Sequence, residues 1–293
     1  MTSVAQPSGR SKWSAYWRLM RFDKPIGILL LLWPTLIALW IAGSGHPSIR
    51  NLLIFCTGVV LMRAAGCIMN DVADREFDPH VQRTRARPLA AGELTVREAM
   101  AMFLILMLLA FGLVLLTNAL TIKLAFVGAA LAASYPFFKR VTHFPQVVLG
   151  VAFGWGIPMA FAAETGNVPV VAWWLLAVNI VWSVIYDTLY AMVDRDDDIA
   201  VGIKSTAILF GRKDLLILRI LKLLMLLLLI RVGLMLELGL PWNAAIGITA
   251  LLFGLQQYWV RNREPAASFK AFLNNNWVGL VLFVGLLGHY WTN

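Results

Sequence analysis

The chain has 293 residues, of which 60% are hydrophobic and only 14% are charged, and its mean hydropathy is +0.74. This composition excludes a soluble domain and predicts a membrane protein. The formal net charge of +9 does not indicate a nucleic-acid partner, because the basic residues cluster between apolar runs, where they anchor membrane spans on the cytoplasmic side.

A short basic segment, residues 1–24, comes first in the chain and lacks the apolar core of a secretory signal. Its aromatic residues Trp13, Tyr16 and Trp17 predict an amphipathic helix at the membrane surface.

Nine apolar stretches follow, and each is long enough to cross a bilayer as a helix. We therefore expect an all-α, polytopic membrane protein in which residues 25–293 form a single nine-helix transmembrane domain. The predicted spans cover residues 25–42, 52–69, 99–117, 120–138, 145–163, 170–192, 215–236, 242–260 and 269–290.

The distribution of Lys and Arg predicts the orientation of these spans. With the N-terminus in the cytoplasm, the basic loops 75–97, 195–213 and 261–270 are all cytoplasmic, and the opposite loops are nearly free of Lys and Arg. Two acidic runs, which close the second and sixth spans, then fall on the same cytoplasmic side.

The first acidic run holds Asn70, Asp74 and Asp78, which share one face if the helix continues through them, because they are spaced by four residues. Asp187, Tyr190, Asp194 and Asp198 form a second stripe of the same kind. Two facing carboxylate stripes predict a site for hard divalent cations, and Mg²⁺ binds well where substrate phosphates complete its shell.

The alternative for acids at a helix end is a solvated surface charge. An aspartate is unfavourable near a helix C-terminus, and two such runs on one membrane side favour a functional site. Asp196 and Asp197 point away from the stripe and fit the surface interpretation, whereas Asp71 fits either.

Three basic residues are candidates for binding substrate. Arg63 lies within the second span, seven residues before Asn70, so it faces the same way about 10 Å deeper. Its guanidinium suits a carboxylate ligand, although it could instead pair with Asp187. Arg140 and Lys204 are candidates near the cytoplasmic ends of spans, where the alternative for both is an ordinary interfacial anchor.

The two acidic motifs, Asn70-Asp71-x-x-Asp74-x-x-x-Asp78 and Asp194-x-x-x-Asp198, resemble those of the UbiA superfamily of intramembrane aromatic prenyltransferases. The predicted spans fit that superfamily along nearly the whole chain. More narrowly, five segments are similar to bacterial 4-hydroxybenzoate polyprenyltransferases: Arg18–Gly27, Met62–Cys67, Tyr135–Arg140, Tyr186–Arg195 and Gly202–Gly211.

The resemblance implies a helical bundle around a central cavity in the bacterial inner membrane, with an active site that faces the cytoplasm and a role in ubiquinone biosynthesis. It implies Mg²⁺ as cofactor, with a polyprenyl diphosphate and an aromatic acid as substrates. Asp187 and Tyr190 are then candidates to hold or deprotonate the phenol, and packing is the alternative for Tyr190.

Two rival functions remain at this point. A related membrane prenyltransferase would use another aromatic acceptor. An ion-coupled transporter would place its acids near the bilayer midplane, on broken helices.

Overall fold

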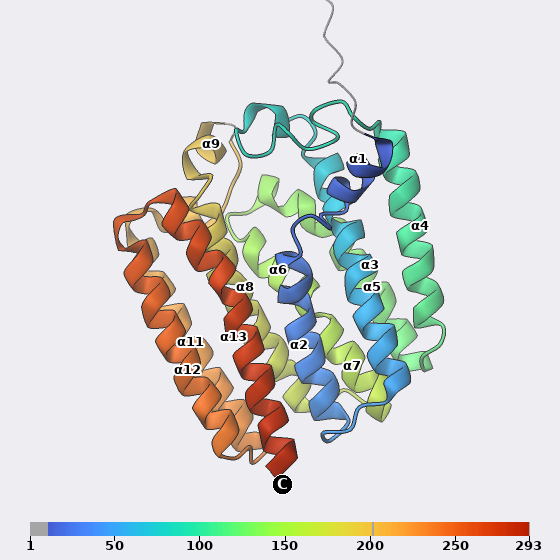
Figure 1. Cartoon of the computed structure of the whole chain (residues 1–293), viewed down its shortest axis with the longest axis vertical. Helices are drawn as coiled ribbons and strands as arrows, with labels where there is room; N and C mark the ends of the chain where they lie inside the picture. The colour runs from blue at the N-terminus through green and yellow to red at the C-terminus, as the bar shows by residue number, and fades with distance from the viewer. Residues whose placement is uncertain (1–10, 201, 293) are drawn as a thin grey trace, which may run out of the picture.

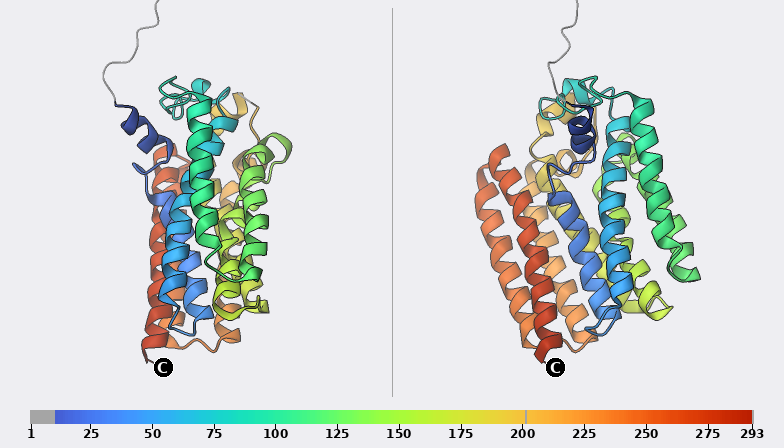
Figure 2. Two further views of the ribbon diagram at one scale, coloured as in Figure 1. Left: turned by 90° about the vertical axis from the view of Figure 1, so that its right-hand side faces the viewer. Right: turned by 45° about the vertical axis from the view of Figure 1, so that its right-hand side comes forward.

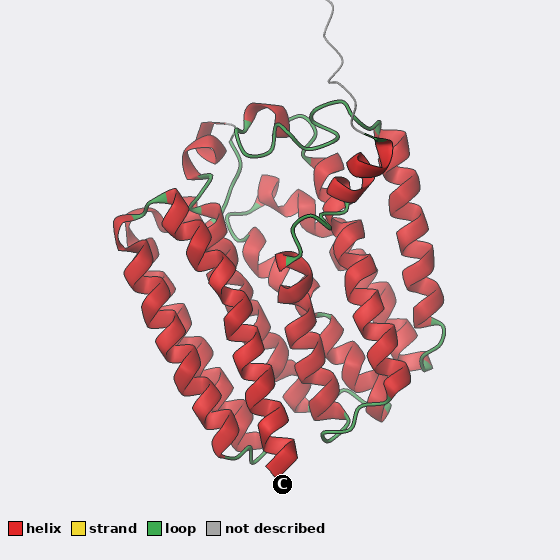
Figure 3. Ribbon diagram, viewed as in Figure 1, coloured by secondary structure: helices red, strands yellow, loops and turns green. Residues whose placement is uncertain are grey.

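The computed structural model describes residues 11–200 and 202–292, and every regular element in that part of the chain is helical (Figure 3). The prediction of an all-α fold is therefore confirmed. Residues 1–10 of the predicted basic segment lie outside the described residues.

The long helices run side by side along one axis of the molecule (Figure 1). They are α2 (Ile26–Ala42), α3 (Ile49–Ala73), α4 (Val96–Val114), α5 (Ala119–Val141), the pair α6 (Pro145–Gly154) and α7 (Gly156–Thr165), α8 (Val170–Ala191), α11 (Asp214–Met235), α12 (Leu240–Trp259) and α13 (Pro265–Thr292).

Each predicted span corresponds to one of these helices or to the α6–α7 pair. Within the described residues, six are both long and apolar enough to cross a membrane: α3, α4, α5, α6 with α7, α8 and α13. The chain is therefore a multi-pass membrane protein. The count of nine spans stays a prediction, because α2 has only 17 residues, α11 carries three basic side chains and α12 is not among the six.

Short elements gather at one end of the bundle, which we call the polar end (Figure 2). They are α1 (Lys12–Leu19), η1 (Asp78–His80), α9 (Arg195–Ala200), α10 (Thr206–Phe210), η2 (Gly211–Lys213) and η3 (Val260–Asn262). The side chains of Trp13 and Trp17 are exposed on α1, as expected for a helix at a membrane surface. The C-terminus lies at the opposite end.

The fifth predicted span is not one continuous helix, because it breaks at Trp155, between α6 and α7. The indole N–H of Trp155 donates to the Leu124 carbonyl of α5 at 2.8 Å. Glycines before the break let α8 approach: a Cβ at Gly150 would lie 2.8 Å from the Ile180 backbone, and one at Gly154 would lie 2.6 Å from the Asn179 side chain. These glycines therefore serve close helix packing.

Both acidic runs leave the helix earlier than the sequence predicts. Helix α3 ends at Ala73 with Asp74 as its C-cap, and α8 ends at Ala191, before Asp194. The prediction of unbroken helical stripes is therefore wrong. The physical reason is that carboxylates oppose the helix dipole at a C-terminus, so the chain turns where they begin.

Candidate active site

A cavity of about 1400 Å³ runs through the bundle between α2, α3, α4, α5, α8 and α13, with α6 and α7 forming part of its wall. Charged side chains line it at the polar end, and Leu, Met, Phe and Gly residues line it further in. Among the predicted site residues, five line this cavity: Arg63, Asn70, Asp71, Asp187 and Tyr190.

The first acidic run is held by basic side chains from three different segments. The Asp71 carboxylate, only 1% exposed, accepts hydrogen bonds from Arg21 at 2.7 and 3.0 Å and lies 3.2 Å from Arg87. Arg87 also donates to Asp78 at 2.9 and 3.1 Å, and Lys139 pairs with Asp74. Burial of these acids is tolerated because each has a cationic partner.

The second acidic run is bound by the same loop that partners the first. Arg83 Nε donates to both Asp194 oxygens, at 2.9 and 2.8 Å, and Arg83 Nη1 donates to the Tyr190 hydroxyl. Its guanidinium stacks 4.5 Å from the centre of the Tyr190 ring. Because Arg83 and Arg87 are four residues apart, one short stretch of chain joins Asp194 to Asp71 and Asp78.

Two carboxyl groups of the acidic runs have a raised pKa. Burial, and next the charge of Asp194, raise the pKa of Asp198 to about 7. Burial also raises the pKa of Asp78, with Asp74 and Asp71 adding to the effect and Arg87 opposing it.

The carboxylate and amide oxygens at the polar end are ligands of the type that a hard divalent cation prefers. Asn70 Oδ1 and Asp74 Oδ1 are both buried, and neither has a hydrogen-bond partner. Among the described residues, no three His, Cys, Asp or Glu side chains converge tightly enough to form a complete metal cage. This arrangement suits Mg²⁺, which binds through one or two carboxylates and takes its remaining ligands from water and substrate phosphates.

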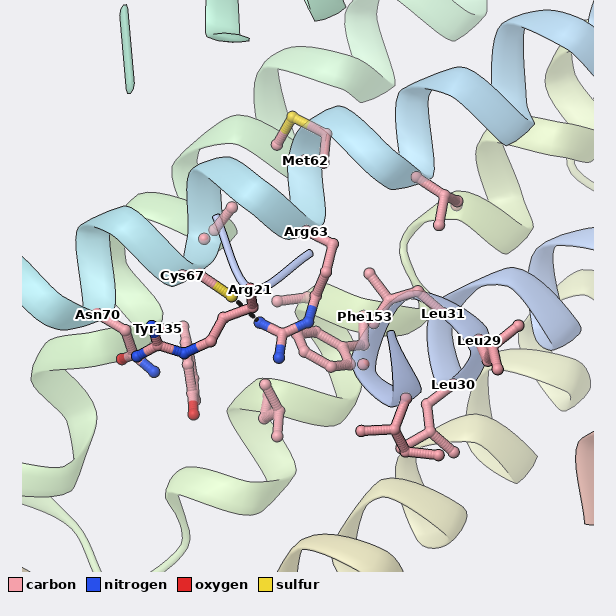
Figure 4. A pocket seen from close by; sticks show the side chains of 18 of the residues that line it. Arg21, Leu29, Leu30, Leu31, Met62, Arg63, Cys67, Asn70, Tyr135 and Phe153 are labelled. Atoms are coloured by element: carbon pink, nitrogen blue, oxygen red, sulfur yellow. Dashed lines mark hydrogen bonds between the residues drawn. The ribbon is translucent and has the colours of Figure 1, made fainter. Parts of the chain in front are cut away.

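Arg63 lies deeper in the cavity, on α3, with its side chain extended toward Phe153 and the start of α2 (Figure 4). Its Nη1 lies 2.5 Å from the Cys67 sulfur, and its guanidinium carbon is 5.9 Å from the centre of the Phe153 ring. Its Nε is buried without a hydrogen-bond partner. Asp187, the alternative partner predicted from sequence, forms no ion pair with it, so the guanidinium keeps free donors in the cavity.

Arg140 and Lys204 do not lie at the cavity, contrary to the expectation from sequence. Arg140 donates to the Ala73 carbonyl at the end of α3 and stacks on Phe77, and Lys204 Nζ donates to the Val141 carbonyl at 3.2 Å. Successive residues of a helix point about 100° apart, so Lys139, rather than Arg140, faces the acids.

Sequence reasoning did not single out the four basic residues that hold the acids: Arg21, Arg83, Arg87 and Lys139. A signal was present for the loop arginines, since cations beside paired acidic runs at a predicted phosphate site suit diphosphate binding. The pairing itself depends on the path of the loop, which no periodic pattern describes.

Comparison with known proteins now identifies the class. The UbiA prenyltransferase family matches residues 31–283, and the chain belongs to this family. In agreement, the fold superposes on the apo structure of a UbiA homolog from Aeropyrum pernix K1 with a TM-score of 0.79, at 25% identity, over 89% of this chain and 97% of that one. A UbiA homolog from Archaeoglobus fulgidus bound to GPP and Mg²⁺ shares the fold with a TM-score of 0.75, at 19% identity, over 95% of this chain and 100% of that one.

More similar relatives narrow the class. The chain is 57% identical to the 4-hydroxybenzoate octaprenyltransferase of Methylococcus capsulatus over 283 residues, which cover 97% of each chain. It is also 57% identical to the protein of the same name from Providencia stuartii, over 96% of this chain and 97% of that one.

Proposed function

We propose that this protein transfers a polyprenyl chain from a polyprenyl diphosphate to 4-hydroxybenzoate, at the ring carbon ortho to the hydroxyl group. The observation that carries the proposal is one cavity lined at its polar end by Asn70, Asp71 and arginines, with one further arginine, Arg63, in its apolar interior. Two of the arginines at the polar end, Arg83 and Arg87, pair with Asp194 and Asp78 just outside the lining. The names of the 57% identical relatives support the same acceptor.

The polar end is the proposed site of the diphosphate. Mg²⁺ would be held there by five side chains: Asn70, Asp74, Asp78, Asp194 and Asp198. Bound Mg²⁺ would neutralise negative charge on the leaving diphosphate. Arg83 and Arg87 stand beside the same carboxylates, where they can donate charge-assisted hydrogen bonds to diphosphate oxygens.

The reaction exchanges one bond for another. The allylic carbon–oxygen bond breaks, and its electron pair leaves with the diphosphate. The ring carbon then donates an electron pair to the allylic carbon and loses its proton. An allylic cation is quenched by water, so the apolar lining of the cavity, including Leu30, Phe55 and Phe153, serves to exclude it.

The acceptor is proposed to lie between the acids and Arg63. The guanidinium matches the planar carboxylate of 4-hydroxybenzoate, which points the hydroxyl end toward Asp187 and Tyr190. These two side chains would hold or deprotonate the phenol. Asp71 is the weaker catalytic candidate, because Arg21 and Arg87 already occupy its carboxylate.

We place the protein in the bacterial inner membrane, with its polar end toward the cytoplasm, in ubiquinone biosynthesis. An ion-coupled transporter fits less well, because the acidic runs stand at the polar end, and the broken helix at Trp155 brings no acid to the bundle interior.

The test is turnover of Asp74→Asn and Asp194→Asn variants, purified in detergent, with a polyprenyl diphosphate, 4-hydroxybenzoate and Mg²⁺. Each substitution keeps the size of the side chain and removes one charged ligand, so we expect folded protein without measurable product. Undiminished product from either variant, or from the parent protein in excess chelator, would contradict the metal-dependent mechanism.

A further inference from the structure

A second charged cluster lies at the polar end, outside the lining of the cavity. Its centre is Asp214, the first residue of α11, whose side chain is 0% exposed. Arg195 donates to Asp214 Oδ2 at 2.5 Å, and Arg263 Nε donates to Oδ1 at 3.0 Å and to Oδ2 at 3.3 Å. The Leu215 N–H also donates to Oδ1, at 2.6 Å.

The cluster joins three chain segments that are far apart in sequence. Arg195 begins α9, Asp214 begins α11, and Arg263 follows η3 before α13. Arg263 adopts a left-handed backbone conformation, with φ of +58°, and its Nη2 donates to the Arg212 carbonyl at 3.0 Å. That conformation is uncommon for a non-glycine residue, and here the Arg263 side chain is hydrogen-bonded to both Asp214 and Arg212.

The position of Arg195 in the chain connects the cluster to the proposed metal ligands, because Arg195 directly follows Asp194. Asp194 is the last residue of the short turn between α8 and α9, and Arg195 begins α9. Asp194 pairs with Arg83, which lines the cavity, whereas Arg195 pairs with Asp214, which lies outside the lining. A diphosphate in the cavity would compete for Arg83, but it would not reach Asp214, so the second anchor persists when the first is exchanged.

We propose that Asp214 is a positioning residue: by holding Arg195, it fixes the start of α9, between Asp194 in the preceding turn and Asp198 within the helix, and so sets the affinity for Mg²⁺ and diphosphate. The inference rests on the proposed function, because it assumes that these two acids bind the metal–diphosphate. Groups that orient metal ligands commonly change affinity by about 10- to 100-fold when they are removed.

The test is a calorimetric titration of the whole protein in detergent with Mg²⁺ and inorganic diphosphate, which reports binding without turnover. We expect Asp214→Asn and Arg195→Gln each to weaken binding by about 10- to 100-fold. The affinity of the double variant should equal that of the single variant with the lower affinity, because both substitutions break the same Arg195–Asp214 pair. Asp214→Glu keeps the charge and should restore most of the affinity. The KM for 4-hydroxybenzoate should not change in any of them.

A matched control is Glu98→Gln, which also converts a carboxylate to an amide at the polar end. It breaks the pair with Lys12 but can keep the capping box with Thr95, and it should bind like the parent protein. Parent-like affinity in Arg195→Gln would overturn the inference, and so would additive losses in the double variant. If Asp214→Asn does not fold, the Arg195→Gln variant alone decides the test. Absence of binding by the parent protein would instead contradict the proposed function.

Discussion

At the scale of single residues, the polar end is built from charges that are already paired. Asp71, Asp74, Asp78 and Asp194 each contact an arginine or lysine in the structure. A metal–diphosphate could replace these contacts without leaving a charge unpaired, since the cation takes carboxylates and the anion takes the guanidinium groups. The site can therefore exchange partners at low cost in desolvation.

As a proposed metal ligand, Asp198 would make metal binding depend on pH. Burial and the neighbouring Asp194 raise the pKa of Asp198 to about 7, so the carboxyl is largely protonated below that pH and ionised above it. Only the ionised form is a good ligand, and we therefore expect Mg²⁺ affinity to increase as the pH rises through this range, with release of protons on binding. Calorimetry at about pH 6 and about pH 8 measures both effects.

In the Asp198→Asn variant the same titration should lose most of its pH dependence, because the amide does not ionise. A parent-like slope in that variant would assign the dependence to another group.

The proposed acceptor end of the cavity contains a single guanidinium, that of Arg63. Arg63→Lys keeps the charge but loses the planar pair of donors, so we expect the KM for 4-hydroxybenzoate to rise about tenfold, the loss of roughly one charge-assisted hydrogen bond. Steady-state kinetics with each substrate varied in turn measures this. A rise confined to the KM of the prenyl diphosphate would place Arg63 in the donor site instead.

The sequence singles out acids and an arginine as candidates for the site, because charged residues beside or within apolar runs stand out. Arg63, Asp71 and Asp187 line the cavity, together with Asn70 and Tyr190, whereas the other candidate acids lie outside its lining. The sequence does not predict Arg21, Arg83, Arg87 or Lys139 as partners of the acids. Partner choice depends on how the irregular segments cross the polar end, and irregular segments have no periodicity to read.

At the scale of elements, the crossing of α2 and α3 gives Arg63 its place. A Cβ at Gly27, near the start of α2, would lie 2.2 Å from Arg63 Nε and 2.4 Å from Nη2. The guanidinium therefore occupies space that only glycine leaves open on α2. Gly27 ends the segment Arg18–Gly27, which is similar to bacterial 4-hydroxybenzoate polyprenyltransferases. Nothing in the sequence shows that this glycine faces Arg63.

Gly27→Ala should displace the Arg63 side chain without unfolding the protein, because the crowded atoms are the far end of a flexible side chain and alanine suits a helix. We expect a KM for 4-hydroxybenzoate raised about as much as in Arg63→Lys, with thermal stability in detergent unchanged or higher. Gly247→Ala on α12, where a Cβ would meet nothing within 4 Å, is the control and should leave the KM unchanged, with thermal stability unchanged or higher. A normal KM in Gly27→Ala would show that the position of Arg63 does not matter for the acceptor.

Helix α13 shows how a polar sequence can hold apolar helices together. Three consecutive side chains reach three different helices: Asn274 accepts from Gln256 of α12, Asn275 from Trp182 of α8, and Asn276 from Trp33 of α2. Because successive helix positions are rotated by about 100°, a run of three asparagines can serve three neighbours. The apolar composition of this stretch predicts a helix, whereas the neighbours of that helix depend on the tertiary fold.

At the scale of the whole molecule, the charges and the apolar surface describe one arrangement in the membrane. Large apolar side chains outside the cavity lining are exposed, among them Leu104, Leu223, Leu227 and Leu251, where lipid would cover them. Both acidic runs and their basic partners stand at the polar end, and the C-terminus lies at the other end (Figure 2).

The Lys and Arg distribution predicts that the polar end faces the cytoplasm, and cysteine labelling in sealed cells tests this. In a protein whose native Cys56 and Cys67 are replaced, Gln82→Cys places a thiol at an exposed position of the polar end, and Asn167→Cys places one in the exposed turn at the opposite end. A membrane-impermeant maleimide should label Asn167→Cys in intact cells, and should label Gln82→Cys only after the membrane is opened, because the basic loops stay on the cytoplasmic side. Both variants should first be shown to make product, so that the labelled molecules are folded. Labelling of Gln82→Cys from outside intact cells would reverse the orientation and would move the diphosphate site away from a cytoplasmic supply of prenyl donor.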